Sequence, residues 1–585
     1  MIALDAPVEA PTRSILLGAY AARSCPVKTQ NAFNPTVAPP QAEPSDALAE
    51  LFEGGAQFEA VVLERLISSA RGRVVDLRLL AAESRAIQIQ ACARAIDSGA
   101  AVIIGGCLPI DLAGHRVGCP DLLIRGADTP TGAPGYHPAE VKWHKIIERV
   151  RRPAVDGEAS PALRYSMLEQ PAPADAIELA GHGLRIGSRW ADLLQLAHYH
   201  RMLESCGHAA SPSLGAIIGT DTVTNGPVLV WAALDQPMLR TFSRSSPEGW
   251  RLRSPLERYD HEHAFRVDIA AVAQRQTGAV TGDPHLLVEP IVNAECGRCQ
   301  WWEHCRPQLD PQDVSLRIDK GPLDMREIAT LRRHGILTIT DLVGADLDEL
   351  LASYLPEVTH RPGAEGRLRV AARRARMLMD GSSFARETDG SITVPDAEVE
   401  IDLDIESSAD GRVYLWGFLV QHATAPDGIY REFSRFDVLD DATEAALAVD
   451  AFTWLRSMID SSGSVAVYHY SGYEIAKIKA LADREHDAVL DWAAEYAEEQ
   501  FVDLLEIVKA HFFGVSGLGL KLIANHAGFR WRDEDPGGLN SQVWFAEAVH
   551  GVTADVRAQA RTRVLQYNED DVTATSQLRA WLRAQ

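Results

Sequence analysis

Three features that would restrict the class of this protein are missing from its 585 residues. No stretch approaches the roughly 18 uninterrupted apolar residues of a membrane span, so we expect no membrane partner. The first residues, MIALDAPVEAPTRS, lack a basic start followed by an apolar core, which predicts a cytoplasmic protein without a secretory signal. An excess of basic residues is missing as well. The formal net charge of −24 weighs against nucleic acid as a partner without excluding it, because basic residues can be concentrated locally.

Cysteine is scarce, with eight residues in the whole chain. In a cytoplasmic protein, metal or cluster binding or simple burial explains cysteines better than disulfide bonds do. The apolar content of 46% and the charged content of 24% are those of an ordinary globular protein. The length exceeds what one hydrophobic core usually organises, so we expect two or three domains.

Composition divides the chain into three blocks, at about residues 12–310, 318–382 and 395–585. The first block mixes helical and strand patterns. The second block is helical, and in LDMREIATLRRHGILTITDLVGADLDELL the residue Gly335 lies between two short helices. Two interpretations of this segment stay open, a packed helical linker or a helix-hairpin-helix whose loop amides hold a phosphate backbone.

A basic cluster ends the second block. Its six arginines, with Glu365 as the only acid among them, are Arg361, Arg367, Arg369, Arg373, Arg374 and Arg376. Either they form a solvated helix face or they contact phosphates.

The third block opens with a strand pattern. Residues 397–406 (AEVEIDLDIE) alternate between apolar and acidic side chains, which predicts a β-strand with one apolar and one acidic face. The strand VYLWGFLV follows a turn at Asp410-Gly411, so the two strands should form a β-hairpin. Helices then alternate with another apolar strand, SVAVYHY, which predicts an α/β domain with a mixed sheet.

The first block contains two carboxylates and a lysine with the spacing of a metal-dependent hydrolytic site. HRVGCPDLLIRG places Asp121 at the end of an expected strand, and YHPAEVKWHK places Glu140 and Lys142 on a second one. Residues two apart on a strand project from the same face, so all three side chains can converge. Two carboxylates can bind Mg²⁺, which activates a water and offsets phosphate charge, while Lys142 positions that water or stabilises the developing charge. The alternative is a surface salt bridge.

Two helices of the same block add polar residues to this candidate site. In LLQLAHYHRML, Gln195 and Tyr199 are four residues apart and share a helix face. In LFEGGAQFEAVVLERL, Glu59 lies at the edge of the apolar stripe, whereas Glu64 points away from it. Glu59 is therefore the better candidate for a third metal ligand, and Glu64 should meet solvent.

This order of elements resembles the RecB-like branch of the PD-(D/E)XK nucleases, which have an upstream helix, a metal-binding Asp, an ExK pair and a QxxxY helix. The resemblance implies that Asp121 and Glu140 are Mg²⁺ ligands and that Lys142 is the catalytic lysine. It also implies that Gln195 and Tyr199 contact DNA in the active site. Many relatives place a metal-binding histidine on the upstream helix, and this chain has none there. The third ligand therefore stays open.

Four cysteines at the two ends of the first block have the spacing of a metal or cluster site. Three of them form a CxxCx₅C pattern in AECGRCQWWEHCRP, and the four are Cys25, Cys296, Cys299 and Cys305. Four thiolates accept a structural Zn²⁺ or an iron–sulfur cluster, and their spacing does not separate the two. The layout resembles that of AddB-type and related RecB-like nucleases, which implies a [4Fe-4S] cluster that acts as a structural clasp. The others are expected to be buried or incidental thiols, namely Cys92, Cys107, Cys119 and Cys206.

A second candidate site lies in the third block. Asp404 and Glu406 share the acidic strand face, which brings two carboxylates within reach of one metal ion. In LQYNEDDVTAT, Tyr567 and Asp571 are four apart on an expected helix and face one way. A DxE strand with a late YxxxD helix resembles the tyrosine-using DEDD exonucleases of the RNase H-like fold. The resemblance implies two Mg²⁺ (or Mn²⁺) ions held by four acidic residues, with Tyr567 orienting the attacking water.

The remaining acid of that pattern should follow the next strand. VAVYHYSGYEIAKIKAL supplies Glu474 where aspartate is usual, and the extra methylene shifts the carboxylate. Asp503 is an auxiliary candidate, although such a residue more often caps a helix, and Asp402 is the alternative if the metal-binding pair is shifted. The third block can therefore be an active, a weakened or a purely binding domain.

Nearly the whole chain resembles a family of RecB-like nucleases that joins an iron–sulfur PD-(D/E)XK domain to a C-terminal RNase H-like exonuclease domain. The resemblance implies an α/β protein with those two domains and a helical linker, within the three blocks given above. We expect metal-dependent DNA cleavage, at ends or on single strands, in repair or recombination. No GxxxxGK[ST] signature is present, so ATP-driven unwinding would need a separate helicase partner. The alternatives are a nucleic-acid-binding scaffold with partly degenerate sites, and an RNA-processing exonuclease.

Overall fold

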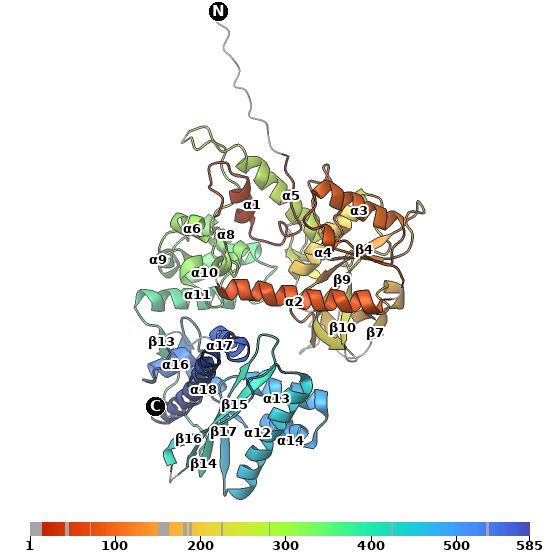
Figure 1. Cartoon of the computed structure of the whole chain (residues 1–585). Helices are drawn as coiled ribbons and strands as arrows, with labels where there is room; N and C mark the ends of the chain where they lie inside the picture. Colours follow the sequence, from red (N-terminus) through yellow and green to blue (C-terminus); the bar gives the residue numbers. More distant parts are fainter. Residues whose placement is uncertain are drawn as a thin grey trace, which may run out of the picture. The chain divides into compact units, whose positions relative to one another are not determined.

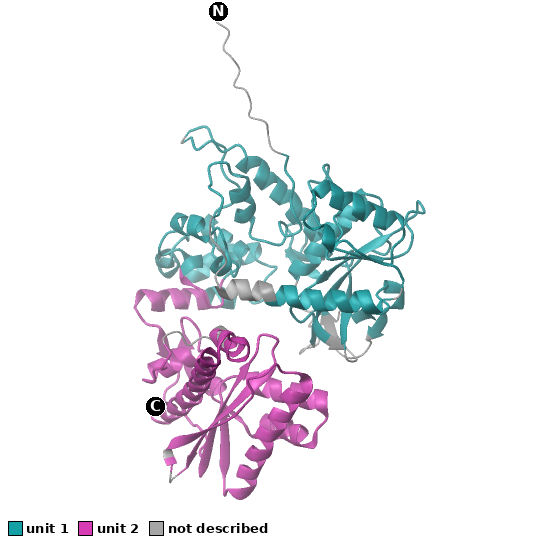
Figure 2. Ribbon diagram, in the orientation of Figure 1, with its two compact units in different colours: residues 1–316, 323–369 teal, residues 317–322, 370–585 magenta. Residues whose placement is uncertain are grey.

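The computed structural model describes residues 14–40, 46–70, 72–149, 163–179, 184–186, 190–223, 226–279, 281–422, 425–533 and 538–585. The chain forms two compact units, residues 1–316 with 323–369 and residues 317–322 with 370–585 (Figure 2). Each unit combines helices with a mixed β-sheet, and the sequence predicts the mixed sheet for the third block. Among the described helices, none has the length and apolar character needed to cross a lipid bilayer.

In the described part of the first unit, the largest sheet has eight strands in the order β1-β2-β3-β4-β9-β10-β6-β7. Their bounds are β1 Val74–Asp76, β2 Val102–Ile104, β3 Leu122–Arg125, β4 Tyr136–Val141, β9 Leu214–Val223, β10 Gly226–Ala233, β6 Leu163–Met167 and β7 Ile177–Leu179. β4 pairs antiparallel with β3 and parallel with β9, and all six of its residues are buried. A strand buried on both faces is usually apolar, and Glu140 is the acidic exception within β4.

Helices cover both faces of this sheet. α2 (Asp46–Ser69) packs the buried side chains of Val62, Leu63 and Leu66 against one face. α4 (Trp190–Ser205) packs against the other face, where it contacts β4 and β9. Ile217 of β9 lies on the α4 side, and Glu140 pairs with it across the sheet. Because paired residues project to the same side, Glu140 faces α4.

The rest of the first unit consists of short elements around this core. The remaining bounds up to residue 317 are α1 Pro26–Phe33, α3 Arg85–Asp97, β5 Ile147–Arg149, β8 Leu184–Ile186, β11 Leu239–Phe242, β12 Trp250–Arg253, α5 Pro255–Ala273, α6 Trp302–Cys305 and α7 Val314–Arg317. Four helices follow, namely α8 Met325–Arg333, α9 Ile339–Gly344, α10 Leu347–Tyr354 and α11 Ala364–Met379. Gly335 lies between α8 and α9 with a φ of 78°, a backbone conformation that favours glycine.

The second unit contains a five-stranded sheet in the order β16-β15-β14-β17-β18, within the described residues. Its strands are β14 Val399–Ser407, β15 Val413–His422, β16 Ala425–Ser434, β17 Val465–His469 and β18 Val502–Asp503. β14 and β15 form the predicted antiparallel hairpin, and β14 runs parallel to β17. β14 is therefore an inner strand, and side chains on both of its faces are covered by helices.

The helices of the second unit divide between the two faces of that sheet (Figure 1). Helices α12 (Asp441–Ser461), α13 (Tyr473–Glu485) and α14 (Ala488–Gln500) pack on the apolar face of β14. α18 (Ala554–Arg583) crosses the opposite face and contacts β14 and β15. The remaining bounds are β13 Phe384–Arg386, α15 Leu504–His511, β19 Phe512–Gly514, α16 Leu520–His526 and α17 Gly538–His550.

Candidate active sites

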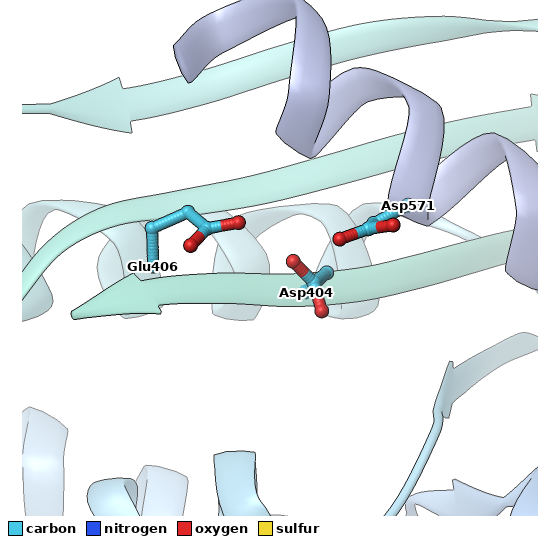
Figure 3. Close-up of side chains that lie close together, drawn as sticks. All are labelled: Asp404, Glu406 and Asp571. Atoms are coloured by element: carbon cyan, nitrogen blue, oxygen red, sulfur yellow. The ribbon is translucent and has the colours of Figure 1, made fainter. Parts of the chain in front are cut away.

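The second unit brings three of the predicted acidic residues together. Because β14 alternates, Leu403 and Ile405 point into the core beneath α12 to α14, and Asp404 and Glu406 lie on the face covered by α18. Asp571 reaches the same place from α18. Ligand oxygens of Asp404, Glu406 and Asp571 all lie within 4.8 Å of one another (Figure 3). Among the described residues, no other group of three His, Cys, Asp or Glu side chains has its ligand atoms this close together.

This three-carboxylate group has the chemistry of a site for a divalent cation. In Figure 3 the three carboxylates point toward one another, two from the strand and one from the helix. Burial raises the pKa of Glu406 to about 8 and the pKa of Asp571 to about 6. Burial and the charges of the other two acids raise the pKa of Asp404 as well. Like charges held this close in a buried place are costly, and Mg²⁺ or Mn²⁺ bound through hard oxygen ligands would remove that cost.

Each carboxylate of the group accepts a hydrogen bond from a different neighbour. The pairs are Asn568 Nδ2 to Asp404 Oδ2 at 2.8 Å, Ser541 Oγ to Glu406 Oε2 at 2.7 Å, and Trp531 Nε1 to Asp571 Oδ1 at 2.7 Å. Sequence reasoning missed all three neighbours. Asn568 carried a signal, since it follows Tyr567 directly, but no pattern relates Trp531 or Ser541 to the strand.

Tyr567 lies one helical turn before Asp571 on α18, and its hydroxyl is among the groups that lower the pKa of the Asp571 carboxyl against the effect of burial. The Tyr567 side chain is almost fully buried, and its hydroxyl accepts a hydrogen bond from Lys521 Nζ at 2.7 Å. Burial and the charge of Asp571 raise the pKa of Tyr567. The hydroxyl therefore stays protonated at neutral pH and can donate to an oxygen atom beside the carboxylates.

Glu474 lies near the three-carboxylate group but outside it. It is buried in the first turn of α13, and its Oε2 atom is 3.4 Å from Nδ1 of His469. Burial raises the pKa of Glu474, while His469 opposes that shift. The charge of Glu474 also contributes to the raised pKa of Asp404. Glu474 thus acts on the group electrostatically while its own carboxylate pairs with a histidine.

Two alternative acids of the sequence analysis are engaged elsewhere. Asp402 is buried against Arg579, with Oδ2 at 2.9 Å from the guanidinium. Asp503 caps α15, where its Oδ1 atom accepts the backbone N–H of Leu505 at 2.9 Å. Each of these carboxylates has a structural partner that a shifted metal site would have to displace, so we place neither in the site.

The first unit places Asp121 beside Glu140, although not as the end of a strand. β3 begins at Leu122, so Asp121 directly precedes it, and the expectation that Asp121 ends a strand is wrong. The physical reason is direction, because β3 runs antiparallel to β4 and its start lies beside the end of β4. Asp121 Oδ2 accepts the backbone N–H of Val141 at 2.9 Å, and the N–H of Asp121 points to Glu140 Oε1 at 3.3 Å.

Glu140 and Lys142 form an ion pair in which Glu140 is buried and Lys142 is half-buried. Lys142 follows the last residue of β4, and its Nζ atom lies 2.7 Å from Glu140 Oε2. Glu140 is 1% exposed, and burial raises its pKa to about 8. Burial lowers the pKa of Lys142, but the charges of Glu140 and Asp121 raise it further, so the ammonium stays charged. A largely buried pair of this kind differs from the surface salt bridge that was the alternative.

Helix α4 adds both polar residues expected from it. Gln195 Nε2 donates to Glu140 Oε2 at 2.6 Å, and the Tyr199 hydroxyl donates to the carbonyl of Cys119 at 3.1 Å. Arg23 was missed by sequence reasoning. Its guanidinium donates to Gln195 Oε1 at 2.6 Å and lies 3.1 Å from the Asp192 carboxylate.

The third ligand of the first site stays a prediction. Burial and then the charge of Asp121 raise the pKa of Glu59, which indicates that the two carboxylates lie near each other. The Glu64 side chain is 68% exposed and pairs with Arg78 at 3.0 Å. Within the described residues, the acids of the first site do not form a group as close as the one in the second unit.

The four cysteines with metal-binding spacing line one pocket together with Trp301 and Trp302. All four are free and half-buried, and they are Cys25, Cys296, Cys299 and Cys305. Burial raises the pKa of Cys25, Cys296 and Cys305. Among the described residues no three of these sulfurs lie within 4.8 Å of one another.

Two of the remaining cysteines are not incidental thiols. Cys107 and Cys119 form a disulfide bond, so the expectation for this pair is wrong. The chain between them folds back on itself, with the backbone N–H of Leu108 donating to the carbonyl of Gly118 at 3.2 Å. Sequence spacing alone does not reveal such a reversal. Cys92 is buried and Cys206 half-buried, and both are free.

Five of the six arginines in the basic cluster interact with other residues of the chain. The interactions are Arg361 with Asp324, Arg367 with Glu327, Arg369 with Asp348, Arg373 with Glu387, and Arg374 with the carbonyl of Lys320. Guanidinium groups that already have carboxylate partners are less available to a phosphate. The described contacts favour the solvated helix face over the phosphate-contacting one.

Comparison with known protein families gives a match to the C-terminal region. Residues 402–583 match the family model of the RNase_H superfamily, a range that includes every member of the three-carboxylate group. No curated protein and no solved structure is significantly similar to the chain. The expectation of a C-terminal RNase H-like domain is confirmed. Such a domain indicates binding of nucleic acid and a metal-dependent, nuclease-type hydrolysis.

Proposed function

We propose that the chain is a metal-dependent DNA nuclease with two hydrolytic sites, acting as an exonuclease on DNA ends or single strands in repair or recombination. The observation that carries the proposal is the convergence of Asp404, Glu406 and Asp571 beside Tyr567. Its two sites belong to a RecB-like PD-(D/E)XK domain at 12–310 and an RNase H-like DEDDy domain at 395–585, with a helical linker at 318–382. An acidic chain fits this role, because metal-dependent cleavage needs carboxylates where the phosphate is cut.

In the second site, the three carboxylates would hold Mg²⁺ or Mn²⁺. A divalent ion there supplies a water activated for attack and a positive charge beside the scissile phosphate. Asn568, Ser541 and Trp531 orient the carboxylates through their hydrogen bonds. Tyr567 keeps a protonated hydroxyl beside them, which can orient the attacking water. Glu474 is the proposed fourth acid. Its charge raises the pKa of Asp404, which supports a place near the three carboxylates.

In the first site, Asp121 and Glu140 would hold the metal, with Glu59 as the proposed third ligand. Lys142 is the proposed catalytic lysine, since its ammonium lies 2.7 Å from Glu140 and would stabilise charge on a phosphate bound through a metal ion at that carboxylate. Gln195 and Tyr199 are proposed to position the DNA from α4. Glu140 Oε2 accepts hydrogen bonds from both Lys142 and Gln195, so metal binding would use the other oxygen or displace one donor.

The cysteine pocket is proposed to hold a [4Fe-4S] cluster, with structural Zn²⁺ as the alternative. Cys25 lies near the start of the first block and the other three lie near its end. The backbone N–H of Cys25 donates to Glu295 Oε1 at 3.0 Å, which brings these two segments together. The cluster would act as a structural clasp between them. We also propose a cytoplasmic location and a separate helicase partner.

The test is a cleavage assay on end-labelled single- and double-stranded DNA with Mg²⁺ or Mn²⁺. Wild type is compared with Lys142→Ala, Asp404→Ala and the double variant. We expect each single variant to lose one activity and the double variant to lose both. If all four proteins cut equally well, both proposed sites are wrong.

The pairing of Glu474 with His469 favours a second candidate, a nucleic-acid-binding scaffold whose second site is degenerate. That candidate predicts binding of labelled single-stranded DNA by the wild type without cleavage under either metal. RNA processing is distinguished by offering labelled DNA and RNA strands of one sequence under one metal condition. Preferential trimming of the RNA would show that the substrate is RNA rather than DNA.

A further inference from the structure

Lys521 is a cation beside the three-carboxylate group, and it is not among the residues that the sequence predicts for this site. It is the second residue of α16, and its Nζ atom donates to the Tyr567 hydroxyl at 2.7 Å. The same Nζ atom lies 4.9 Å from the centre of the Tyr567 ring. Lys521 is half-buried, and Tyr567 is 4% exposed. The ammonium is therefore held against a buried tyrosine rather than extended into solvent.

The neighbouring tyrosines show that a charged partner is not required to satisfy a buried hydroxyl. The Tyr430 hydroxyl donates to Asn568 Oδ1 at 2.8 Å, and the Tyr414 hydroxyl donates to the carbonyl of Ser541 at 3.2 Å. Both partners are neutral. Partial burial of an ammonium costs more than burial of a neutral donor, so packing alone does not explain a lysine at position 521.

The negative charge of the three carboxylates explains why a lysine lies at position 521. Asp404, Glu406 and Asp571 lie within 4.8 Å of one another and carry up to three negative charges when ionised. Lys521 opposes the effect of burial on the pKa of each of these acids. An ammonium is also a point charge that can bind a phosphate oxygen. The same group can therefore fix Tyr567 and compensate the charge around it.

We propose that Lys521 is a positioning residue of the second site, which holds the Tyr567 hydroxyl beside the three-carboxylate group and supplies a fixed positive charge there. The proposal rests on the proposed function of this site for its catalytic meaning. The effect of the Lys521 charge on metal binding can be measured without substrate. The proposal can therefore be tested even if the protein binds metal but does not cleave DNA.

The first test measures the affinity for Mg²⁺ by titration calorimetry at pH 9, above the pKa of about 8 of Glu406 and the pKa of about 6 of Asp571. The full chain carries Asp121→Asn and Glu140→Gln so that the first site is silent, and the signal lost in Asp404→Asn defines the second site. Removing a positive charge next to a cation site should strengthen Mg²⁺ binding, and for Lys521→Met we expect roughly tenfold. Lys509→Met, at an exposed position of α15, is the matched control and should leave the affinity unchanged.

A structural and an electrostatic role of Lys521 predict opposite changes in the affinity for Mg²⁺. Loss of packing at position 521 would loosen the carboxylates and weaken Mg²⁺ binding. Stronger binding together with slower cleavage supports the proposal, and Lys521→Arg should then retain the wild-type affinity. Affinity that is unchanged or weaker in Lys521→Met, relative to the Lys509→Met control, overturns it.

The second test asks whether Lys521 acts through Tyr567. Single-turnover cleavage of end-labelled DNA is measured for Lys521→Met, Tyr567→Phe and the double variant. Residues that act as one unit have non-additive effects, so the double variant should cleave no more slowly than Tyr567→Phe. Multiplication of the two single effects would show that Lys521 does not position the tyrosine.

Discussion

Asn568 donates a hydrogen bond from Nδ2 to Asp404 Oδ2 at 2.8 Å, while its Oδ1 atom accepts from the Tyr430 hydroxyl at 2.8 Å. The partner of Asp404 on strand β15 is Gly417. A Cβ atom at position 417 would lie 1.6 Å from Asn568 Oδ1. The absence of a side chain at Gly417 is therefore what lets a buried amide of α18 reach the carboxylate on β14.

Gly417→Ala should displace Asn568 and break its contact with Asp404. Overpacking of this kind lowers the free energy of unfolding by about 1–3 kcal/mol, which denaturant unfolding measures. Cleavage by the second site should slow at the same time, because Asp404 loses its orienting donor. Gly366→Ala is the matched control, since position 366 on α11 has open space around it and alanine favours a helix. Equal stability of the two variants would contradict this account of Gly417.

Part of the second site could be predicted from local sequence patterns. Alternation along one strand predicts that Asp404 and Glu406 share a face, and helical spacing predicts that Tyr567 and Asp571 do. Both patterns are local, and the RNase_H superfamily match spans both. The donors Trp531 and Lys521 could not be predicted, because they reach the site from segments that are related to the strand only by the folded chain.

Several contacts in the first unit could not be predicted from local sequence patterns. Asp121 and Glu140 meet because two antiparallel strands lie side by side, which no spacing between their positions encodes. The Cys107–Cys119 bond depends on a chain reversal for the same reason. The buried state of Glu140 also follows from sheet order, since β4 is an inner strand with helices on both faces. Register and strand order are tertiary properties, and they decide these contacts.

Lys142→Ala should reduce cleavage by the first site about 10²- to 10³-fold. The variant removes the cation proposed to stabilise charge in the transition state, and it leaves the buried Glu140 without its ion-pair partner. The rate is measured in an Asp404→Ala background so that only the first site contributes. Lys145→Ala, at an exposed position three residues further on, is the control and should retain the rate. A rate equal to that of the control would remove Lys142 from the site.

The metal-free protein should lose stability as the pH rises from about 5 to about 8. Glu140 and Glu406 have pKa values of about 8 in the folded chain, whereas an unfolded glutamate has a pKa of about 4.3. Between these values the folded state binds more protons than the unfolded state, so the free energy of unfolding falls with rising pH. Thermal unfolding in EDTA across this range measures the effect.

Glu140→Gln with Glu406→Gln should reduce that pH dependence, because an amide does not titrate. Added Mg²⁺ should raise the melting temperature of the wild type most at pH 8, where the carboxylates must otherwise be ionised without a cation. A melting temperature that is constant from pH 5 to pH 8 in EDTA would show that these two side chains are not buried acids.

Cys299→Ser should abolish binding of the metal or cluster and lower the stability of the first unit. Four cysteines line the pocket, and losing one thiolate removes a quarter of the ligand set. Anaerobic purification, iron and zinc analysis and the visible absorbance spectrum measure the loss. Cys206→Ser is the control, since Cys206 is free and lies outside the pocket. A wild-type preparation that is colourless, free of iron and loaded with zinc would replace the cluster with the zinc alternative.

Glu474→Asp tests whether the longer acid is a defect or a fitted part of the second site. Glu474 reaches His469 at 3.4 Å, and shortening it by one methylene should withdraw the carboxylate from that histidine and leave a small cavity in a buried place. We therefore expect slower cleavage than in the wild type, and slower cleavage still for Glu474→Gln, which keeps the length but loses the charge. Glu498→Asp, on the exposed side of α14, controls for the substitution itself. Faster cleavage by Glu474→Asp than by the wild type would mean that glutamate at this position weakens the second site, and would favour the second unit as a nucleic-acid-binding domain.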